Sequence, residues 1–177
     1  EYGYQTRLRT KLTGKCAEHE IDIIAEEKAS GKHYLVECKF HNFPGTYIDL
    51  KEALYTYARL LDLNNAGNGF DGAWLTCNTK ASFEAQKYCS CQGIRLLCWR
   101  YPIDNGLERL ISEKKLYPVT VLRSLDSQTL NRLSKANYVL ARDLLTSSQK
   151  HIKATTGLAD YKLNALLNEA KQIVGEY

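Results

Sequence analysis

Charged side chains interrupt two apolar runs near the start of this chain, and their types suit a site for a divalent cation. The first run, HEIDII, contains Glu20 and Asp22, and the second, LVECKF, contains Glu37 and Lys39. An unpaired charge is costly to bury, so charges within apolar runs indicate a compensating partner. Hard cations such as Mg²⁺ take one or two carboxylates and complete their shell with water and phosphate oxygens. The lysine can orient a water nucleophile or stabilise charge that develops on a phosphate.

Strand geometry is expected to bring the two runs together. Side chains alternate between the faces of a strand, so Glu20 and Asp22 should share one face, with the isoleucine that follows each of them on the other. Glu37 and Lys39 should likewise project together. Residues 26–32 are polar and contain a glycine, as the turn of a β-hairpin does. Because paired strands lie about 5 Å apart, three carboxylates and one ammonium are expected to converge on one face.

Each of these residues also has a plainer structural interpretation. Alternating charges occur on solvated edge strands, and Glu37 with Lys39, taken alone, fits that interpretation equally well. His19 more often packs near a strand start than binds a metal. Glu20 is either a second ligand or a charged neighbour. We take Asp22 and Glu37 as metal ligands, Lys39 as the residue that serves the water or phosphate, and Glu20 as a secondary site residue.

An ordered set of motifs resembles the PD-(D/E)xK nuclease superfamily, and in particular its Mrr-like restriction endonuclease branch. Asp22 followed by Glu37-x-Lys39 is similar to the D…(E/D)xK signature, although Ile21 stands where a proline often does. The other matching segments, in chain order, are GY at 3–4, LYTYAR at 54–59, LTCNT at 75–79 and GI at 93–94. The resemblance covers roughly residues 3–118.

This resemblance implies a Mg²⁺-dependent endonuclease, with Mn²⁺ as an alternative metal, that hydrolyses phosphodiester bonds in DNA, most naturally duplex DNA. Two other functions stay open. One is a catalytically inactive nucleic-acid-binding or assembly module with the same fold. The other is a structure-specific nuclease of the Holliday-junction type, which shares the active site and differs in substrate shape.

Periodicity predicts an α/β fold. Strands are expected at 4–12, 33–40, 73–77 and 94–99, and helices at 48–63 and 82–91, the second begun by a Ser82 cap. Strands that alternate with helices after a hairpin imply a mixed central sheet flanked by helices. Together with the resemblance, this order predicts a restriction-endonuclease-like core over residues 1–118.

A helical appendage is predicted over residues 119–177, where apolar residues recur at helical spacing. Residues 152–170 resemble a helix-hairpin-helix unit, with Gly157 at its turn and Asp160 as the next helix cap. Such hairpins bind DNA phosphate through backbone N–H groups. Ala159 stands where a second glycine often occurs, and a packing or dimerisation role is an equal alternative.

Charge supports a nucleic-acid partner only mildly. The formal net charge is +4, divided into about +1 for residues 1–118 and about +3 for the remainder. Local positive surface matters more than net charge for binding phosphates. The candidates are Arg7, Arg9, Lys11 and Lys15 beside the site, and Lys150, Lys153, Gly157 and Lys162 around the hairpin; for each basic residue, ordinary solvation is the alternative.

Composition suggests a cytoplasmic protein that does not cross a membrane. No apolar run is long enough to span a bilayer, no secretory signal is visible, and the six cysteines, mainly in predicted core elements, fit free thiols. The chain starts at Glu1 and contains no methionine, so we expect the nuclease core to be truncated at its N-terminus. In similar proteins an ATP-cone segment sometimes precedes this core. A homodimer is our hypothesis, because a two-fold axis presents two sites to a duplex.

Overall fold

The computed structural model of this protein describes residues 2–43 and 45–175. These residues form two compact units, residues 1–109 and 110–177. This division falls before the boundary after residue 118 that the resemblance and the helical spacing predicted. None of the helices in the described part of the chain combines the length and apolar character that crossing a bilayer requires.

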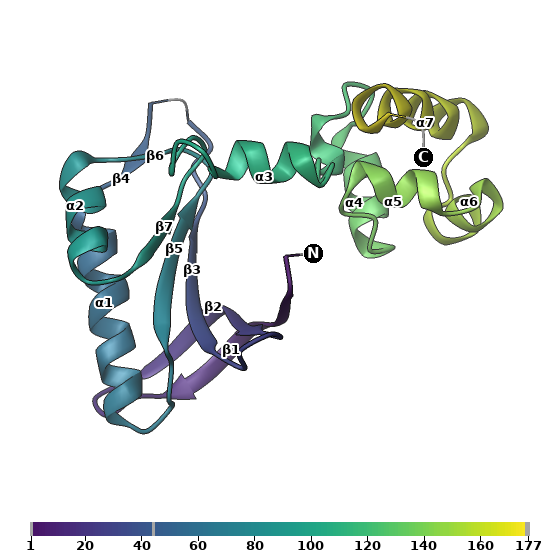
Figure 1. The fold of residues 1–177 in the computed structure, drawn as a ribbon. Helices are drawn as coiled ribbons and strands as arrows, with labels where there is room; N and C mark the ends of the chain where they lie inside the picture. The colour runs from purple at the N-terminus through teal and green to yellow at the C-terminus, as the bar shows by residue number, and fades with distance from the viewer. Residues whose placement is uncertain (1, 44, 176–177) are drawn as a thin grey trace. The chain divides into compact units, whose positions relative to one another are not determined.

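The first unit is built on a mixed five-stranded sheet (Figure 1). Its strands, in spatial order, are β1 (Tyr4–Thr13), β2 (Glu18–Glu27), β3 (His33–Lys39), β5 (Gly72–Cys77) and β7 (Arg95–Leu97). The first three pair antiparallel, and β3, β5 and β7 run parallel. The predicted hairpin between the two charged runs is thus the β2–β3 connection, and the predicted mixed α/β fold is confirmed.

Two helices pack side by side on one face of this sheet. Helix α1 (Leu50–Asn65) begins with a capping box in which the Asp49 side chain accepts the Lys51 amide and Glu52 accepts the Asp49 amide. Helix α2 (Phe83–Cys91) begins at the predicted Ser82 cap, whose hydroxyl accepts the Ala85 amide at 3.1 Å. Two short strands, β4 (Tyr47–Ile48) and β6 (Lys80–Ala81), pair in parallel just before these helices.

The buried core of the first unit consists of two clusters between the sheet and these helices. Around α1 lie Ile21, Ile24, Leu35, Leu60, Leu63, Phe70 and Ala73. Around α2 lie Ile48, Ala53, Leu75, Cys77, Ala85, Cys89, Ile94, Leu96 and Cys98. All six cysteines are free. Cys77, Cys89 and Cys98 are buried, but Cys16, Cys38 and Cys91 are exposed, so the expectation that most cysteines lie in the core was wrong for those three.

The second unit is helical and has a core of its own. Helix α3 (Leu107–Glu113) crosses the boundary between the units, and it is followed by a 3₁₀ turn η1 (Val119–Val121), α4 (Ser127–Lys135), α5 (Ala141–Thr146), α6 (Gln149–Thr156) and α7 (Asp160–Val174). Residues of these later elements form one apolar cluster, including Leu133, Leu144, Ile152, Leu163 and Leu166. The predicted helical appendage is therefore present as a separately packed unit.

The turn between α6 and α7 has the predicted glycine but a different cap. Gly157 adopts a left-handed conformation with φ 64°, which glycine tolerates without steric cost. The residue that caps α7 is Ala159, which makes no side-chain hydrogen bond, and Asp160 is already the first helical residue. The prediction of Asp160 as cap was wrong by one position, and this helix starts without a side-chain cap.

Candidate active site

Glu37 lies near the carboxyl end of β3, where its buried carboxylate contacts two cations. The residue is only 4% exposed. Its Oε1 accepts a hydrogen bond from Lys39 Nζ at 2.7 Å, and its Oε2 accepts one from Nη1 of Arg59 on α1. Such charge-assisted contacts compensate the cost of burying a carboxylate. The expected pairing of Glu37 and Lys39 on one face is present, together with an arginine that sequence reasoning did not assign.

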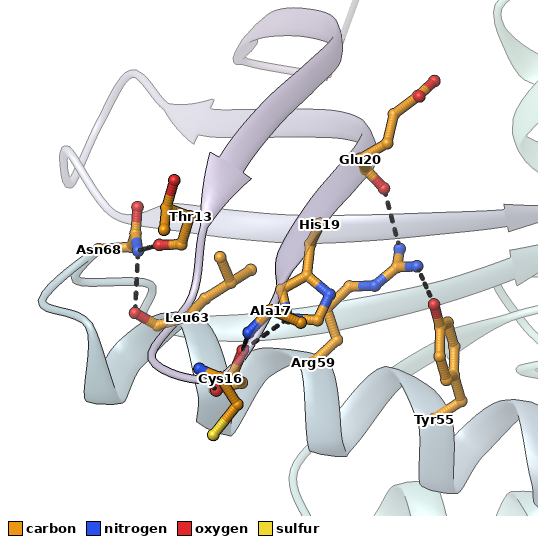
Figure 2. Close-up of polar contacts among 10 residues, drawn as sticks. Thr13, Cys16, Ala17, His19, Glu20, Tyr55, Arg59, Leu63 and Asn68 are labelled. Carbon is orange, nitrogen blue, oxygen red and sulfur yellow. Dashed lines mark hydrogen bonds and ion pairs between the residues drawn. The ribbon is translucent and has the colours of Figure 1, made fainter.

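Arg59 is held on α1 by four contacts, of which Figure 2 shows the hydrogen bonds to Glu20 and Tyr55. Besides Glu37, its guanidinium donates to the main-chain oxygen of Glu20 at 3.2 Å and to the Tyr55 hydroxyl at 2.6 Å. The guanidinium carbon also lies 4.6 Å from the centre of the Tyr55 ring. The Arg59 Nε is buried and has no hydrogen-bond partner within the described residues. A buried unpaired N–H costs about 1–3 kcal/mol, so this position of Arg59 carries a desolvation cost.

Asp22 binds the backbone of β3 beside Glu37. Its Oδ2 accepts the Cys38 amide at 2.8 Å. The pairing of β2 with β3 begins at Glu26 opposite His33 and ends at Ile23 opposite Val36. Asp22 is the next residue of β2 beyond the last pair. Its carboxylate therefore satisfies a strand amide where the two strands stop pairing. Asp22 Oδ1 has no hydrogen-bond partner among residues 2–43 and 45–175.

The regular alternation that we expected in β2 is broken around Asp22. Ile21 and Ile24, three residues apart, both pack in the cluster against α1. On the neighbouring strand, Arg9 adopts a positive φ of 46°. These two observations mark a local distortion of the β1–β2 hairpin, so the prediction of strict alternation along β2 was wrong here.

Glu20 does not join the other carboxylates. Its side chain points away from Arg59, the residue that binds Glu37, while only its main-chain oxygen faces that guanidinium (Figure 2). The side chain is exposed, and its carboxylate has no hydrogen bond or ion pair with any described residue. The predicted convergence of three carboxylates is therefore wrong, and the group consists of Glu37, Lys39, Arg59 and the adjacent Asp22.

His19 has the packing role that was its plainer interpretation. Its Nε2 lies 2.8 Å from Oδ2 of Asp62 on α1. The same carboxylate accepts the amides of Cys16 and Ala17, so it ties the β1–β2 turn to the helix. The hydrogen bond from His19 lowers the pKa of Asp62 to about 2. A Cβ on Gly14 would lie 2.0 Å from Asp62 Oδ2, which explains the glycine in this turn.

The predicted DNA-binding residues, all exposed except the half-buried Lys162, lie on different elements. Arg7, Arg9 and Lys11 lie along the edge strand β1, and Lys15 lies in the turn after it. Lys11 pairs with Glu18 at 3.4 Å.

In the second unit, Lys150 and Gly157 are exposed, Lys153 pairs with Asp160, and Lys162 pairs with Asp126 at 2.6 Å. The Gly157 carbonyl accepts a hydrogen bond from Arg132 at 2.9 Å. Two of the lysines proposed for the hairpin are thus already neutralised by neighbouring carboxylates.

The donor set fits a hard cation in type. No group of three or more His, Cys, Asp or Glu within the described residues is arranged to hold a metal. Mg²⁺ needs only one or two carboxylates, because water and phosphate fill its remaining positions. Asp22 offers an open oxygen. Glu37 offers a carboxylate already contacted by Lys39 and Arg59, so a metal there would take the place of a cation or share the carboxylate with one.

The chain is similar to a known protein over nearly all of its residues. The model of the AF1548-like C-terminal domain matches residues 117–174. An uncharacterized protein from Archaeoglobus fulgidus is 42% identical over 175 residues, which is 99% of this chain and 97% of that protein. The similarity therefore extends over both units.

Two solved structures give very different degrees of similarity. A crystal structure of a protein of unknown function, AF1548, superposes with a TM-score of 0.82 at 42% identity, covering 98% of this chain and 90% of that one. XPF from Aeropyrum pernix in complex with DNA is 13% identical, covers 81% of this chain and 80% of that one, and reaches a TM-score of 0.25. A TM-score that low carries no argument about this chain.

Proposed function

The chain belongs to the AF1548-like family, and we propose that it is a metal-dependent endonuclease that hydrolyses phosphodiester bonds in DNA. The observation that carries the proposal is the group at the end of β3. Glu37 and Lys39 contact each other at 2.7 Å, and Asp22 binds the amide of Cys38 between them. The proximity of these three residues supports the proposal, because Asp22, Glu37 and Lys39 are the residues that resemble the D…(E/D)xK signature of PD-(D/E)xK nucleases of the Mrr-like branch.

Each residue has a role that follows from its chemistry. Asp22 and Glu37 would hold Mg²⁺ or Mn²⁺, which would stabilise phosphate charge and lower the pKa of a bound water. Lys39 is about one-third exposed (34%), so its ammonium reaches solvent and can contact a phosphate oxygen on duplex DNA. Arg59 fixes the orientation of Glu37 from the opposite side.

A second candidate function is a nucleic-acid-binding or assembly module without catalysis. The observation that favours it is the charge state around Glu37, whose two oxygens already contact two cations. A carboxylate neutralised in this way is a weaker metal ligand than a free one. In that case, the ion pairs would serve the fold alone.

Plasmid cleavage separates these two functions. Supercoiled DNA is incubated with the protein and Mg²⁺ or Mn²⁺, with EDTA as the metal-free control. Asp22→Asn and Lys39→Ala are compared with the exposed changes Asp104→Asn and Lys87→Ala. We expect metal-dependent cleavage that falls about 100-fold or more in the two site variants and is unchanged in the two controls.

Equal cleavage by the wild type and Asp22→Asn would refute the proposed site, and an inert wild type would favour the non-catalytic module. Linear duplex and four-way junction substrates, compared at equal concentration, then test whether the enzyme selects DNA by shape.

A further inference from the structure

We propose that this is a one-metal site in which the guanidinium of Arg59 permanently occupies the position that a second metal ion would take. The inference rests on the proposed function, because it takes Glu37 as a metal ligand. It goes further by fixing the number of metal ions and by giving Arg59 the role of a positioning residue.

The first step is the environment of the guanidinium. Three oxygens from three different kinds of group surround it: the carboxylate of Glu37, the main-chain carbonyl of Glu20 and the hydroxyl of Tyr55. Carboxylate, carbonyl and hydroxyl oxygens are what a hard divalent cation binds. Arg59 therefore fills an oxygen-lined position that suits a cation.

The second step is that Arg59 is fixed there. Its side chain is 9% exposed, and the ring of Tyr55 lies against the guanidinium at 4.6 Å. Arginine keeps its positive charge at any physiological pH. The Lys39 ammonium, on the other oxygen of Glu37, is 34% exposed and has Glu37 as its ion-pair partner among the described residues. Lys39 is therefore the cation that can move away.

The third step is distance. In two-metal sites the ions lie about 3.5–4 Å apart and share a carboxylate. Arg59 Nη1 is in hydrogen-bond contact with Oε2 of Glu37, so a metal bound at the other oxygen, Oε1, would have the guanidinium as its close neighbour. A second divalent ion added beside both would meet strong repulsion. The carboxylate pair can thus accept one metal, on the side of Lys39 and Asp22.

Mn²⁺ binding to the full chain tests this inference through stoichiometry and not through activity. Calorimetric titration counts the ions, and electron paramagnetic resonance detects magnetic coupling between two of them. We expect the wild type to bind one Mn²⁺ per chain, with an uncoupled spectrum. Arg59→Gln should bind two Mn²⁺ with a coupled spectrum, because the cation position is vacated. Arg95→Gln, which changes an arginine stacked 4.1 Å over Trp74, should still bind one.

Two coupled Mn²⁺ ions in the wild type would overturn the inference while leaving the proposed function intact. One Mn²⁺ in a folded Arg59→Gln would also overturn it, because Arg59 would not be what limits the number. If Arg59→Gln does not fold, Arg59→Met, which also removes the positive charge, replaces it and should bind two ions; one ion bound by a folded Arg59→Met would overturn the inference. No Mn²⁺ bound by the wild type would instead refute the metal site of the proposed function, and the inference with it.

Discussion

At the residue scale, the buried Glu37 carboxylate connects the stability of the first unit to its proposed chemistry. Its two cationic partners come from different elements, Lys39 from the same strand and Arg59 from α1. A buried ion pair contributes little when compared with apolar residues of similar volume, but breaking one partner leaves an uncompensated charge. Glu37 therefore supports the fold of the first unit and, in the proposed function, the binding of a metal ion.

Glu37→Ala should lower the free energy of unfolding by about 3–5 kcal/mol, because it strands the buried Arg59 guanidinium. Urea unfolding followed by circular dichroism measures this change. Glu20→Ala is the matched control, since its carboxylate is exposed and unpaired within the described residues, and it should change stability by less than about 0.5 kcal/mol. Similar losses in the two variants would contradict the ion-pair geometry.

The sequence indicated Asp22, Glu37 and Lys39 but not Arg59. The first three are visible because charges in apolar strands are unusual. Arg59 lies within the LYTYAR segment, where an arginine on a helix reads as a solvated residue. The one available signal is that Tyr55 and Arg59 are four residues apart on one face of α1. Nothing local shows that this face meets Glu37, because that contact depends on how α1 packs on the sheet.

At the element scale, the β1–β2 hairpin is fixed to α1 through Asp62. This carboxylate accepts two turn amides and pairs with His19 on β2. It thereby holds the strand that carries Asp22 against the helix that carries Arg59. The alternation pattern predicted β2 but could not predict its distortion, since the break depends on Asp22 bonding to the neighbouring strand and on the backbone of Arg9.

The Asp62 contact predicts a pH-dependent contribution to stability. Its pKa in the folded protein is about 2, below the value near 4 of an unfolded aspartate. Its stabilisation is therefore complete above about pH 4 and is lost as the pH falls through about 2. The urea midpoint of the wild type should exceed that of Asp62→Asn at pH 6, and the gap should narrow at pH 3. A gap that is constant with pH would contradict the stabilisation of the Asp62 carboxylate by its hydrogen bonds.

The uncapped start of α7 predicts a stabilising substitution. Ala159 is exposed and has the extended backbone of an N-cap, but its side chain accepts no amide. Ala159→Ser should stabilise the second unit by about 0.5–2 kcal/mol, measured by urea unfolding. Ser148→Ala, which removes the cap that bonds the His151 amide of α6, should destabilise it by a similar amount. No gain from Ala159→Ser would show that the α7 start is satisfied in another way.

At the scale of the whole molecule, the candidate features lie in two separately packed units. The first carries the candidate site and the basic edge strand, and the second carries the turn at Gly157. Helical spacing after residue 118 predicted the character of the second unit. The change at residue 110 was not visible, because α3 is a short helix that runs across it without a break in composition.

The second unit should fold alone. Among the described residues, its apolar cluster and the partly buried side chains packed on it all lie between residues 117 and 174. A fragment of residues 110–177 should give a helical circular dichroism spectrum and a cooperative thermal transition. A fragment of residues 1–109, prepared in the same way, is the matched comparison. A disordered 110–177 fragment would contradict the division.

The most direct test of the metal centre is anomalous diffraction from crystals of the full chain soaked in Mn²⁺. A single anomalous peak is expected in each chain, at a distance of about 2 Å from oxygens of both Asp22 and Glu37, with Lys39 moved from its present contact. A saturating soak that gives no peak at these two carboxylates, or places the ion elsewhere, would contradict the assignment of this site as a metal-dependent nuclease centre.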